Sequence, residues 1–234
     1  MSSKKNIFFV TSTGTDLGKT FISKNIIEIF KKKNITIIPY KPIMSGVNRD
    51  NIFSSDSAQL LKVLQSKVTT KDINKISPWI FKKPLAPTLA AKKEKKELKY
   101  LSVKDWLKKE INILKTEYAL IEGAGGLLVP IGQKKTFLNL IHELELPVIL
   151  VVGNYLGAIS HTISLIKNIE LLKIKVINIV LNEHCIKQLK IEETESILRE
   201  NLNRKYKIIK IYTCKKKNSE AFGHIYQNII KFFK

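Results

Sequence analysis

The sequence predicts an α/β fold in which a mostly parallel, doubly wound sheet is flanked by helices. Two observations lead to this prediction. Short apolar segments alternate with amphipathic segments of helical periodicity along the 234 residues, and this alternation is typical of βαβ units. One apolar segment, 147–152, is apolar at every position, as expected for a strand that is buried on both faces of a parallel sheet.

The first half of the chain contains three predicted strands and three predicted helices. We expect the strands at 7–10, 35–40 and 118–122, and the helices at 21–30, at 55–64 and from about 102 to 115. A capping-box pattern, Ser102 to Asp105, is expected to open the third helix. The segment 65–87 is predicted to be irregular, because prolines at 78, 84 and 87 act as breakers.

The second half repeats this alternation. We expect strands at 147–152, 175–181 and 208–211, a helix at 158–172, a further helix before the last strand and a closing helix. No linker, internal repeat or low-complexity segment interrupts the pattern. The prediction is therefore a single domain over residues 1–234.

The segment Gly18-Lys19-Thr20 lies between the first predicted strand and the first predicted helix. Free backbone N–H groups and the helix dipole make such a helix start an anion site. Lys19 would reach the β- and γ-phosphates, and the Thr20 hydroxyl would hold Mg²⁺. The strict phosphate-loop pattern has glycine where this chain has Thr13, so an accidental strand–turn–helix corner is the alternative. The strand-to-helix context favours a nucleoside triphosphate.

Polar side chains follow several predicted strands at the edge where ligands bind in such sheets. Lys41 follows the second strand, Glu122 ends the third, and Asn182 ends a later one. Lys41 could alternatively be interpreted as an ordinary surface lysine, and Asp56 as a helix N-cap residue. A carboxylate in a buried strand needs a partner such as a metal, and Mg²⁺ prefers oxygen ligands. Glu122 is therefore the strongest of these candidates.

The net charge of +21 and the isoelectric point near 9.8 raise the possibility of a polyanionic partner. The charge is nearly all lysine and is spread along the whole chain, whereas nucleic-acid interfaces concentrate charge and recruit arginine. The cluster 92–96 is interpreted as a solvated helix end. We therefore expect salt-sensitive adhesion to polyanions but no specific nucleic-acid partner.

The sequence gives no indication of a membrane or a secretory location. No apolar segment approaches the roughly 20 residues that span a bilayer, and the N-terminus lacks a signal-peptide pattern. Cys185 and Cys214 are too few for a disulfide framework. We expect a cytoplasmic protein with no membrane partner.

Several segments, in the same order along the chain, resemble those of the dethiobiotin synthetase family. The resemblance covers nearly the whole chain, and no single segment would suffice for it. The matching segments are Thr15 to Thr20, Tyr40 to Gly46 (YKPIMSG), Ser55 to Ala58, Pro84 and Pro87, Glu122 to Gly126 (EGAGG) with Pro130, and 146–153 with Leu156, Gly157 and His161.

The resemblance implies a P-loop NTPase-like ligase that uses ATP and Mg²⁺ and forms a homodimer. In the implied reaction, 7,8-diaminononanoate takes up CO₂ as a carbamate, the carbamate attacks the γ-phosphate of ATP, and the second amine closes the ring of dethiobiotin. ADP and phosphate are released. The family's activity thus makes the chain a candidate enzyme of biotin biosynthesis.

The resemblance also implies a role for each matching position. Lys41, Lys19 and Thr15 would be catalytic, and the metal would be held by Thr20, Asp56 and Glu122. The nucleotide would contact Asp16, Leu17, Gly18, Lys19, Thr20, Phe21 and Glu122, with Asn182 at the adenine edge. The diamine and carbamate would contact Thr15, Ser45, Gly125 and Gly126, and the segment from Tyr155 to Ser160 would reach the neighbouring subunit's pocket.

The chain departs from the family pattern at a few positions. Ser12 and Gly14 stand where the family usually has glycine and aspartate, so a positive φ at Ser12 would cost backbone energy. Asp16 replaces the common glutamate and Ser160 the frequent asparagine. The usual proline after the last strand is missing near Tyr212, which bears on adenine recognition.

Two other classes of protein share the predicted fold. A partitioning-type ATPase that acts on DNA or membrane would use the positive charge, but its phosphate loop has a lysine in place of Gly14. The tail 228–234 is also too short to anchor well to a membrane. A metallochaperone NTPase is disfavoured because Cys and His do not cluster in the sequence.

Overall fold

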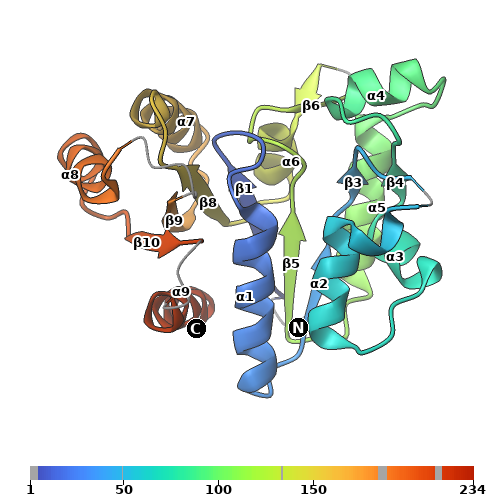
Figure 1. Cartoon of the computed structure of the whole chain (residues 1–234), viewed down its shortest axis with the longest axis horizontal. Helices are drawn as coiled ribbons and strands as arrows, with labels where there is room; N and C mark the ends of the chain where they lie inside the picture. The colour runs from blue at the N-terminus through green and yellow to red at the C-terminus, as the bar shows by residue number, and fades with distance from the viewer. Residues whose placement is uncertain (1–4, 49, 133, 184–188, 214–217) are drawn as a thin grey trace.

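The computed structural model describes residues 5–48, 50–132, 134–183, 189–213 and 218–234. Its centre is a six-stranded sheet in the order β10-β9-β8-β1-β5-β2, with every neighbouring pair parallel (Figure 1). The predicted fold class is confirmed. The strands are β1 Asn6–Ser12, β2 Ile37–Tyr40, β5 Tyr118–Glu122, β8 Val148–Gly153, β9 Val176–Glu183 and β10 Ile208–Tyr212.

Both faces of this sheet are buried, because alternate residues of its central strands enter two separate apolar clusters. On β1, Phe8 and Val10 belong to one cluster and Ile7 and Phe9 to the other. The first cluster is covered by α1 (Lys19–Lys32) and α9 (Ser219–Phe233). The second is covered by α5 (Tyr100–Asn112), α6 (Phe137–Glu143), α7 (Ala158–Leu171) and α8 (Ile191–Asn201).

Helix α1 follows β1 directly and fixes the phosphate-loop segment against the sheet. Its buried apolar residues recur at helical spacing and form one face. Phe30 at the end of this face packs edge-on against Tyr118 of β5, with ring centroids 4.9 Å apart, and against Tyr226 of α9 at 5.2 Å. The start of α1 is thereby held at the carboxyl edge of the sheet, where the candidate site lies.

The segment predicted to be irregular contains regular structure, so that prediction was wrong. Helix α3 (Thr70–Ile76) starts at a capping box, in which the side chains of Thr69 and Asp72 each bond the other's backbone N–H. Strand β4 (Trp79–Ile80) pairs with β3 (Ile43–Met44). Pro87 begins a helix, α4 (Pro87–Lys93), because proline is well suited to a first helical position.

The predicted capping box at Ser102 was also wrong. Helix α5 already begins at Tyr100, and its N-cap residue, Lys99, makes no side-chain cap bond within the described residues. The helix starts two residues before Ser102 because Tyr100 is buried on the same helix face as Val103 and Leu107. The remaining elements are the short helix Ile52–Ser54, α2 (Asp56–Leu64) and the antiparallel pair β6 (Pro130–Gly132) and β7 (Lys135–Thr136).

The remaining predictions concern the lysine cluster at 92–96, membrane-spanning segments and the two cysteines. Helix α4 ends at Lys93, and lysines 92, 93, 95 and 96 are exposed, so the solvated helix end is confirmed. No helix in the described ranges is long and apolar enough to cross a bilayer. Cys185 and Cys214 lie outside the described residues.

We predict that Phe30→Ala lowers the free energy of unfolding by about 3–5 kcal/mol, because it leaves a cavity where α1, α9 and β5 meet. Urea unfolding followed by circular dichroism measures the loss. The matched control is Leu171→Ala, which removes a side chain that is 79% exposed and is expected to change stability by at most about 0.5 kcal/mol. Equal effects of the two substitutions would contradict the packing described here.

Candidate functional site

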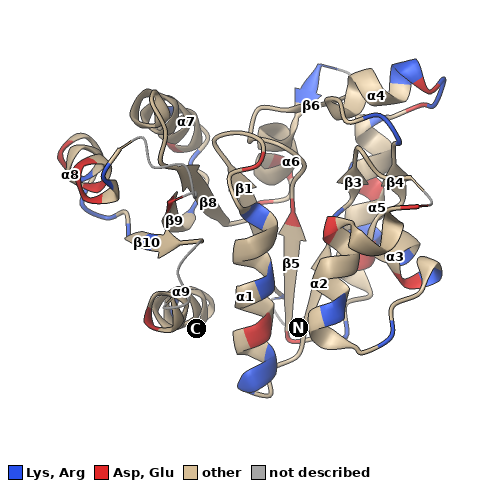
Figure 2. Cartoon of the chain, viewed as in Figure 1, with Lys and Arg blue, Asp and Glu red and all other residues tan. Residues whose placement is uncertain are grey.

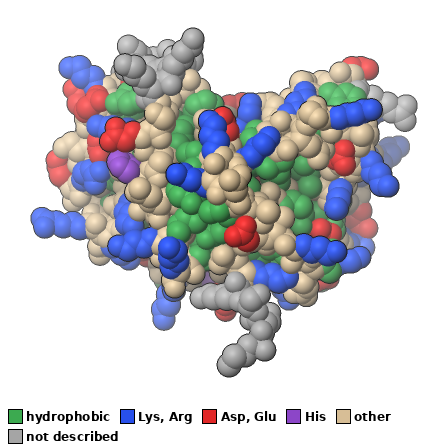
Figure 3. All heavy atoms as spheres, turned by 90° about the horizontal axis from the view of Figure 1, so that it is seen from below, with side chains coloured by type: hydrophobic (Ala, Val, Ile, Leu, Met, Phe, Trp, Pro, Cys, Tyr) green, Lys and Arg blue, Asp and Glu red, His purple; other side chains and the backbone are tan. Residues whose placement is uncertain are grey.

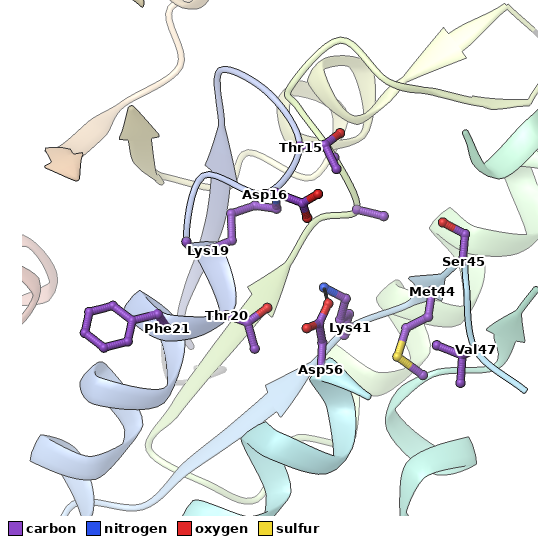
Figure 4. Close-up of a pocket in the computed structure, with 13 residues that line it drawn as sticks. Thr15, Asp16, Lys19, Thr20, Phe21, Lys41, Met44, Ser45, Val47 and Asp56 are labelled. Atoms are coloured by element: carbon purple, nitrogen blue, oxygen red, sulfur yellow. Dashed lines mark ion pairs between the residues drawn. The ribbon is translucent and has the colours of Figure 1, made fainter. Parts of the chain in front are cut away.

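A pocket of about 360 Å³ opens at the carboxyl edge of the sheet, beside the start of α1. It brings together the loop after β1, the end of β2, the start of α2 and the loop after β5 (Figure 4). The residues that line it are Thr15, Asp16, Gly18, Lys19, Thr20, Phe21, Lys41, Met44, Ser45, Val47, Asp56, Ala124 and Gly125.

The loop between β1 and α1 has the conformation of an anion site. Gly18 precedes the first turn with φ at 91°, a left-handed conformation that glycine adopts without strain. Asp16 also has a positive φ, at 56°. No side chain of the described residues caps α1 at Gly18, so the N–H groups of its first turn face the pocket end of the helix and can bind phosphate oxygens.

Lys19 rests on this loop and is 6% exposed. Its Nζ donates to Ser12 Oγ at 3.1 Å and to the carbonyl oxygen of Gly14 at 3.3 Å. Burial, reinforced by repulsion from Lys41, lowers the pKa of Lys19 to about 8. The ammonium group is therefore a cation that a triphosphate would stabilise.

Lys41 lies at the centre of the acidic part of the pocket. Its Nζ is 2.6 Å from Glu122 Oε1 and 2.5 Å from Asp56 Oδ2, and Figure 4 shows Lys41 and Asp56 pointing toward one another. Thr20 donates its hydroxyl to the same Glu122 Oε1 at 2.8 Å. The Glu122 carboxylate of β5 thus binds Thr20 of α1 and Lys41, which follows β2, and Lys41 in turn binds Asp56 of α2.

The pKa shifts in this cluster follow from burial and ion pairing. Burial disfavours the ammonium form of Lys41, but the charges of Glu122 and Asp56 outweigh it and raise the pKa of Lys41 above its usual value. Burial likewise disfavours the carboxylate of Asp56, and the charge of Lys41 outweighs it and lowers the pKa of Asp56. Both groups are consequently charged at neutral pH.

The donor set fits a divalent cation with hard-ligand preference. Thr20, Asp56 and Glu122 supply one hydroxyl and two carboxylates, and Glu122 Oε2 is buried with no hydrogen-bond partner among the described residues. The described part of the chain holds no group of three or more His, Cys, Asp and Glu side chains suited to a metal. Such a cation would therefore also rely on water and substrate phosphates, as Mg²⁺ does.

The glycine loop after β5 packs directly against the phosphate loop. A Cβ atom added to Gly126 would lie 3.3 Å from the Gly14 nitrogen and from the Ser12 oxygen, so a side chain there would push against the backbone of the phosphate loop. The N–H of Leu127 donates to the carbonyl oxygen of Ser12 at 2.9 Å. Gly125 lines the pocket together with Thr15 and Ser45, whereas Gly126 is not one of the lining residues.

Ser12 does not have the strained backbone that glycine would relieve. It is the last residue of β1, pairs in register with Val151 and is absent from the positive-φ residues of the described chain. Its buried hydroxyl lies 2.5 Å from the Gly14 carbonyl oxygen and 3.1 Å from that of Gly125, and it accepts from Lys19. Because the φ of Ser12 is not positive, the condition for a backbone cost is not met, and the contact with Lys19 was not predicted.

Asn182 is wholly buried and does not line the pocket. Its Nδ2 donates to the Leu17 carbonyl oxygen at 3.0 Å, and its Oδ1 accepts from the Thr213 hydroxyl at 2.6 Å. The amide thereby ties the phosphate loop to the strands β9 and β10. Sequence reasoning could not find this use, because it depends on which atoms the fold brings within reach.

Tyr155 and Ser160 also lie away from the pocket of their own chain. The Tyr155 hydroxyl is 2.8 Å from His161 Nδ1, and the Ser160 hydroxyl donates to the Gly157 carbonyl oxygen at 2.9 Å. Between them, Leu156 is 82% exposed. The segment is thus outside the pocket of its own chain, although Tyr155 packs against the apolar cluster that contains Leu17 of the phosphate loop.

Comparisons with known proteins agree with the geometry of the pocket. A family model described as an AAA domain matches residues 6–210. An ATP-dependent dethiobiotin synthetase of Legionella pneumophila is 35% identical over 199 residues, covering 84% of this chain and 89% of the relative. Another from Phenylobacterium zucineum is 40% identical over 161 residues, covering 67% of each. The chain belongs to the ATP-dependent dethiobiotin synthetase family. It is a ligase of that class.

Solved structures resemble the synthetase at the level of the fold alone. The cell division ATPase MinD of Pyrococcus furiosus has a TM-score of 0.53 and 14% identity, with 96% of this chain and 99% of that chain covered. The hydrogenase maturation factor HypB of Archaeoglobus fulgidus has a TM-score of 0.51 and 15% identity, with 98% and 91% covered. These identities support the fold assignment but give no functional argument.

We predict that the synthetase binds ATP more weakly as the pH rises through about 8, because Lys19 then loses its proton. The raised pKa of Lys41 keeps that residue charged over the same interval. Titration calorimetry with a non-hydrolysable ATP analogue measures the binding without interference from the amines of a second substrate. An affinity that stays constant from about pH 7 to 10, the interval that brackets this pKa, would contradict the prediction.

Proposed function

We propose that the chain closes the ureido ring of dethiobiotin from 7,8-diaminononanoate, CO₂ and ATP. One observation carries the proposal: two buried lysines, Lys19 and Lys41, line one pocket together with a helix N-terminus suited to phosphate. A reaction that moves negative charge from a carbamate to a phosphate needs cations at both positions. The relatives are dethiobiotin synthetases, which gives the identity of the product.

The proposed chemistry has three steps. One amine of the diamine adds to CO₂ and loses a proton, which gives a carbamate. A carbamate oxygen attacks the γ-phosphorus of ATP, the bond to the β-phosphate oxygen breaks, and ADP leaves. The second amine then attacks the carbonyl carbon of the mixed anhydride, phosphate leaves, and the ring closes. Holding both amines beside the activated carbonyl supplies proximity to the last step.

In this scheme Lys19 neutralises the phosphates, and Lys41 neutralises the carbamate and the transferring phosphoryl group. Lys19 is held by its contacts with the phosphate loop before substrate arrives, so little reorganisation of this group is needed as charge develops. Thr15, Ser45 and Gly125 line the same pocket, and we assign the diamine and carbamate to them, with the neighbouring Gly126 as backbone support.

We assign Mg²⁺ to Thr20, Asp56 and Glu122, whose hydroxyl and carboxylate oxygens are linked through Lys41 and Glu122 beside the start of α1. The ion would supply charge neutralisation for the triphosphate. Asp16, Leu17, Gly18 and Phe21 belong to the loop and first turn that would hold the phosphates. We propose that Asn182 affects the adenine edge chiefly by shaping the loop at Leu17, because its Nδ2 and Oδ1 atoms each make a hydrogen bond inside the protein.

We also propose that two copies of the chain form a homodimer. The exposed Leu156 lies on the segment between β8 and α7 that carries Tyr155 and Ser160. The resemblance to the family implies that this segment reaches the neighbouring subunit's pocket, and the exposed leucine is available for that contact. In the dimer, this segment would approach the substrate carboxylate in the partner's pocket.

We further propose a cytoplasmic enzyme without a specific nucleic-acid partner. Figure 2 shows Lys and Arg on helices and loops around the whole molecule, with acidic residues among them. On the face seen in Figure 3, the lysines are scattered between apolar and acidic side chains. A distribution of this kind supports general solubility and loose polyanion binding more than a defined interface.

The proposed function predicts that ATP turnover requires the diamine and bicarbonate together. Labelled bicarbonate should appear in a product with the mass of dethiobiotin, and EDTA should abolish its formation because the triphosphate loses its metal. Mass spectrometry and phosphate release measure the two products of one reaction. ATP hydrolysis that ignores both substrates but rises with DNA would instead favour a partitioning-type switch.

Lys41→Ala is expected to reduce ring closure by about 100- to 1,000-fold, the range for loss of one preorganised charge-stabilising group. Nucleotide binding should largely survive, because the phosphate loop and Lys19 are unchanged. Steady-state product formation and equilibrium binding of an ATP analogue separate the two effects. The control is Lys62→Ala on α2, an exposed lysine outside the pocket. Near-normal turnover of the Lys41 variant would remove Lys41 from the mechanism.

A further inference from the structure

Lys41 has contacts that its proposed part in carbamate chemistry does not explain. We infer that, without nucleotide, the Lys41 ammonium group occupies the place of the divalent cation and keeps free Mg²⁺ out of the site. The metal then enters only with the phosphates of ATP. This inference rests on the magnesium site of the proposed function, and it concerns the order in which the site is filled.

All three candidate metal ligands are already engaged in contacts around Lys41. The ammonium nitrogen lies within hydrogen-bond distance of Asp56 Oδ2 and of Glu122 Oε1, at 2.5 and 2.6 Å. The third ligand, Thr20, donates its hydroxyl to the same Glu122 oxygen. A cation that coordinated these oxygens would have to displace Lys41 from both carboxylates.

The charges of the pocket also oppose a metal ion alone. Asp56 and Glu122 face Lys41 and Lys19, and Asp16 lines the same pocket, so three carboxylates stand against two ammonium groups. Lys41 is 4% exposed and Glu122 is wholly buried, so water screens their charges poorly. Adding a doubly charged ion alone would turn the formal charge of this group from negative to positive while Lys41 and the ion compete for the same carboxylates. Adding it together with a triphosphate would not.

Lys41 can reach new partners within the pocket if a metal ion takes its two carboxylates. Its side chain lines the same pocket as Thr20 and Asp56 and the phosphate loop (Figure 4). A lysine has a long, flexible stem with three rotatable donors at its end. Phosphate or carbamate oxygens in the pocket would replace the carboxylates as its partners, and the carboxylates would become free to bind the metal.

The test measures Mn²⁺ binding to the full chain without nucleotide, by electron paramagnetic resonance, with Mn²⁺ as the probe for Mg²⁺. We expect weak binding by the wild type and about 10- to 100-fold tighter binding by Lys41→Met, the range over which partners of metal ligands alter affinity. Mn²⁺ should also raise the melting temperature of the variant more than that of the wild type. With a non-hydrolysable ATP analogue present, the difference should disappear.

Lys19→Met is the matched control, because it removes a nearby positive charge that does not contact the carboxylates in the described contacts. If Lys19→Met tightens Mn²⁺ binding as much as Lys41→Met, loss of any positive charge in the pocket explains the tighter binding, and the inference fails. Equal Mn²⁺ affinity of the wild type and Lys41→Met also overturns it. Lys41→Gln, neutral and still able to donate, replaces the methionine variant if that chain does not fold.

Failure of this inference and failure of the proposed function give different results. A wild type that forms no ring product, in the presence of all substrates, defeats the ligase. A wild type that forms the product and yet binds Mn²⁺ tightly without nucleotide keeps the ligase and defeats the exclusion by Lys41. Absence of Mn²⁺ binding in every variant, with and without the ATP analogue, overturns the metal site on which the inference rests.

Discussion

The buried carboxylate of Glu122 is the constraint on which the site depends. It ends β5, next to the central strand β1, where no solvent reaches it. An unpaired charge there would cost several kcal/mol, so the surrounding elements must supply donors. Thr20 from α1 and Lys41 from β2 both bond the same oxygen, and Asp56 from α2 shares the lysine. Three elements that are distant in sequence are held in one arrangement by this requirement.

The fold was largely predictable, because its strands are apolar segments bounded by polar loops, and parallel strands buried on both faces have this pattern. The part that was not predictable lacks the pattern. Helix α3 buries only Ile73 and Ile76, so its periodicity is weak, and the capping pair Thr69 and Asp72 stabilises its start. Strand β4 forms by pairing with β3, which is distant in sequence. Such a pairing depends on the tertiary structure and leaves no local pattern in the sequence.

The convergence of the site residues could also be predicted, because parallel strands present their carboxyl ends at one edge of the sheet. The pairing of side chains could not. Lys19 rests on Ser12, and Asn182 uses its amide inside the protein, since these contacts depend on side-chain rotamers and on the distance between loops. Sequence position fixes which residues reach the edge, whereas packing decides which atoms meet there.

The close approach of Gly126 to Ser12 and Gly14 has a consequence for how the protein can vary in evolution. The loop after β1 and the loop after the neighbouring strand β5 meet through main-chain atoms, and a side chain on Gly126 would push them apart. Binding of a ligand to these main-chain atoms then does not depend on which side chains cover the outer surface of the protein. A lysine-rich exterior can accumulate by drift while the backbone scaffold beneath the reacting groups stays the same.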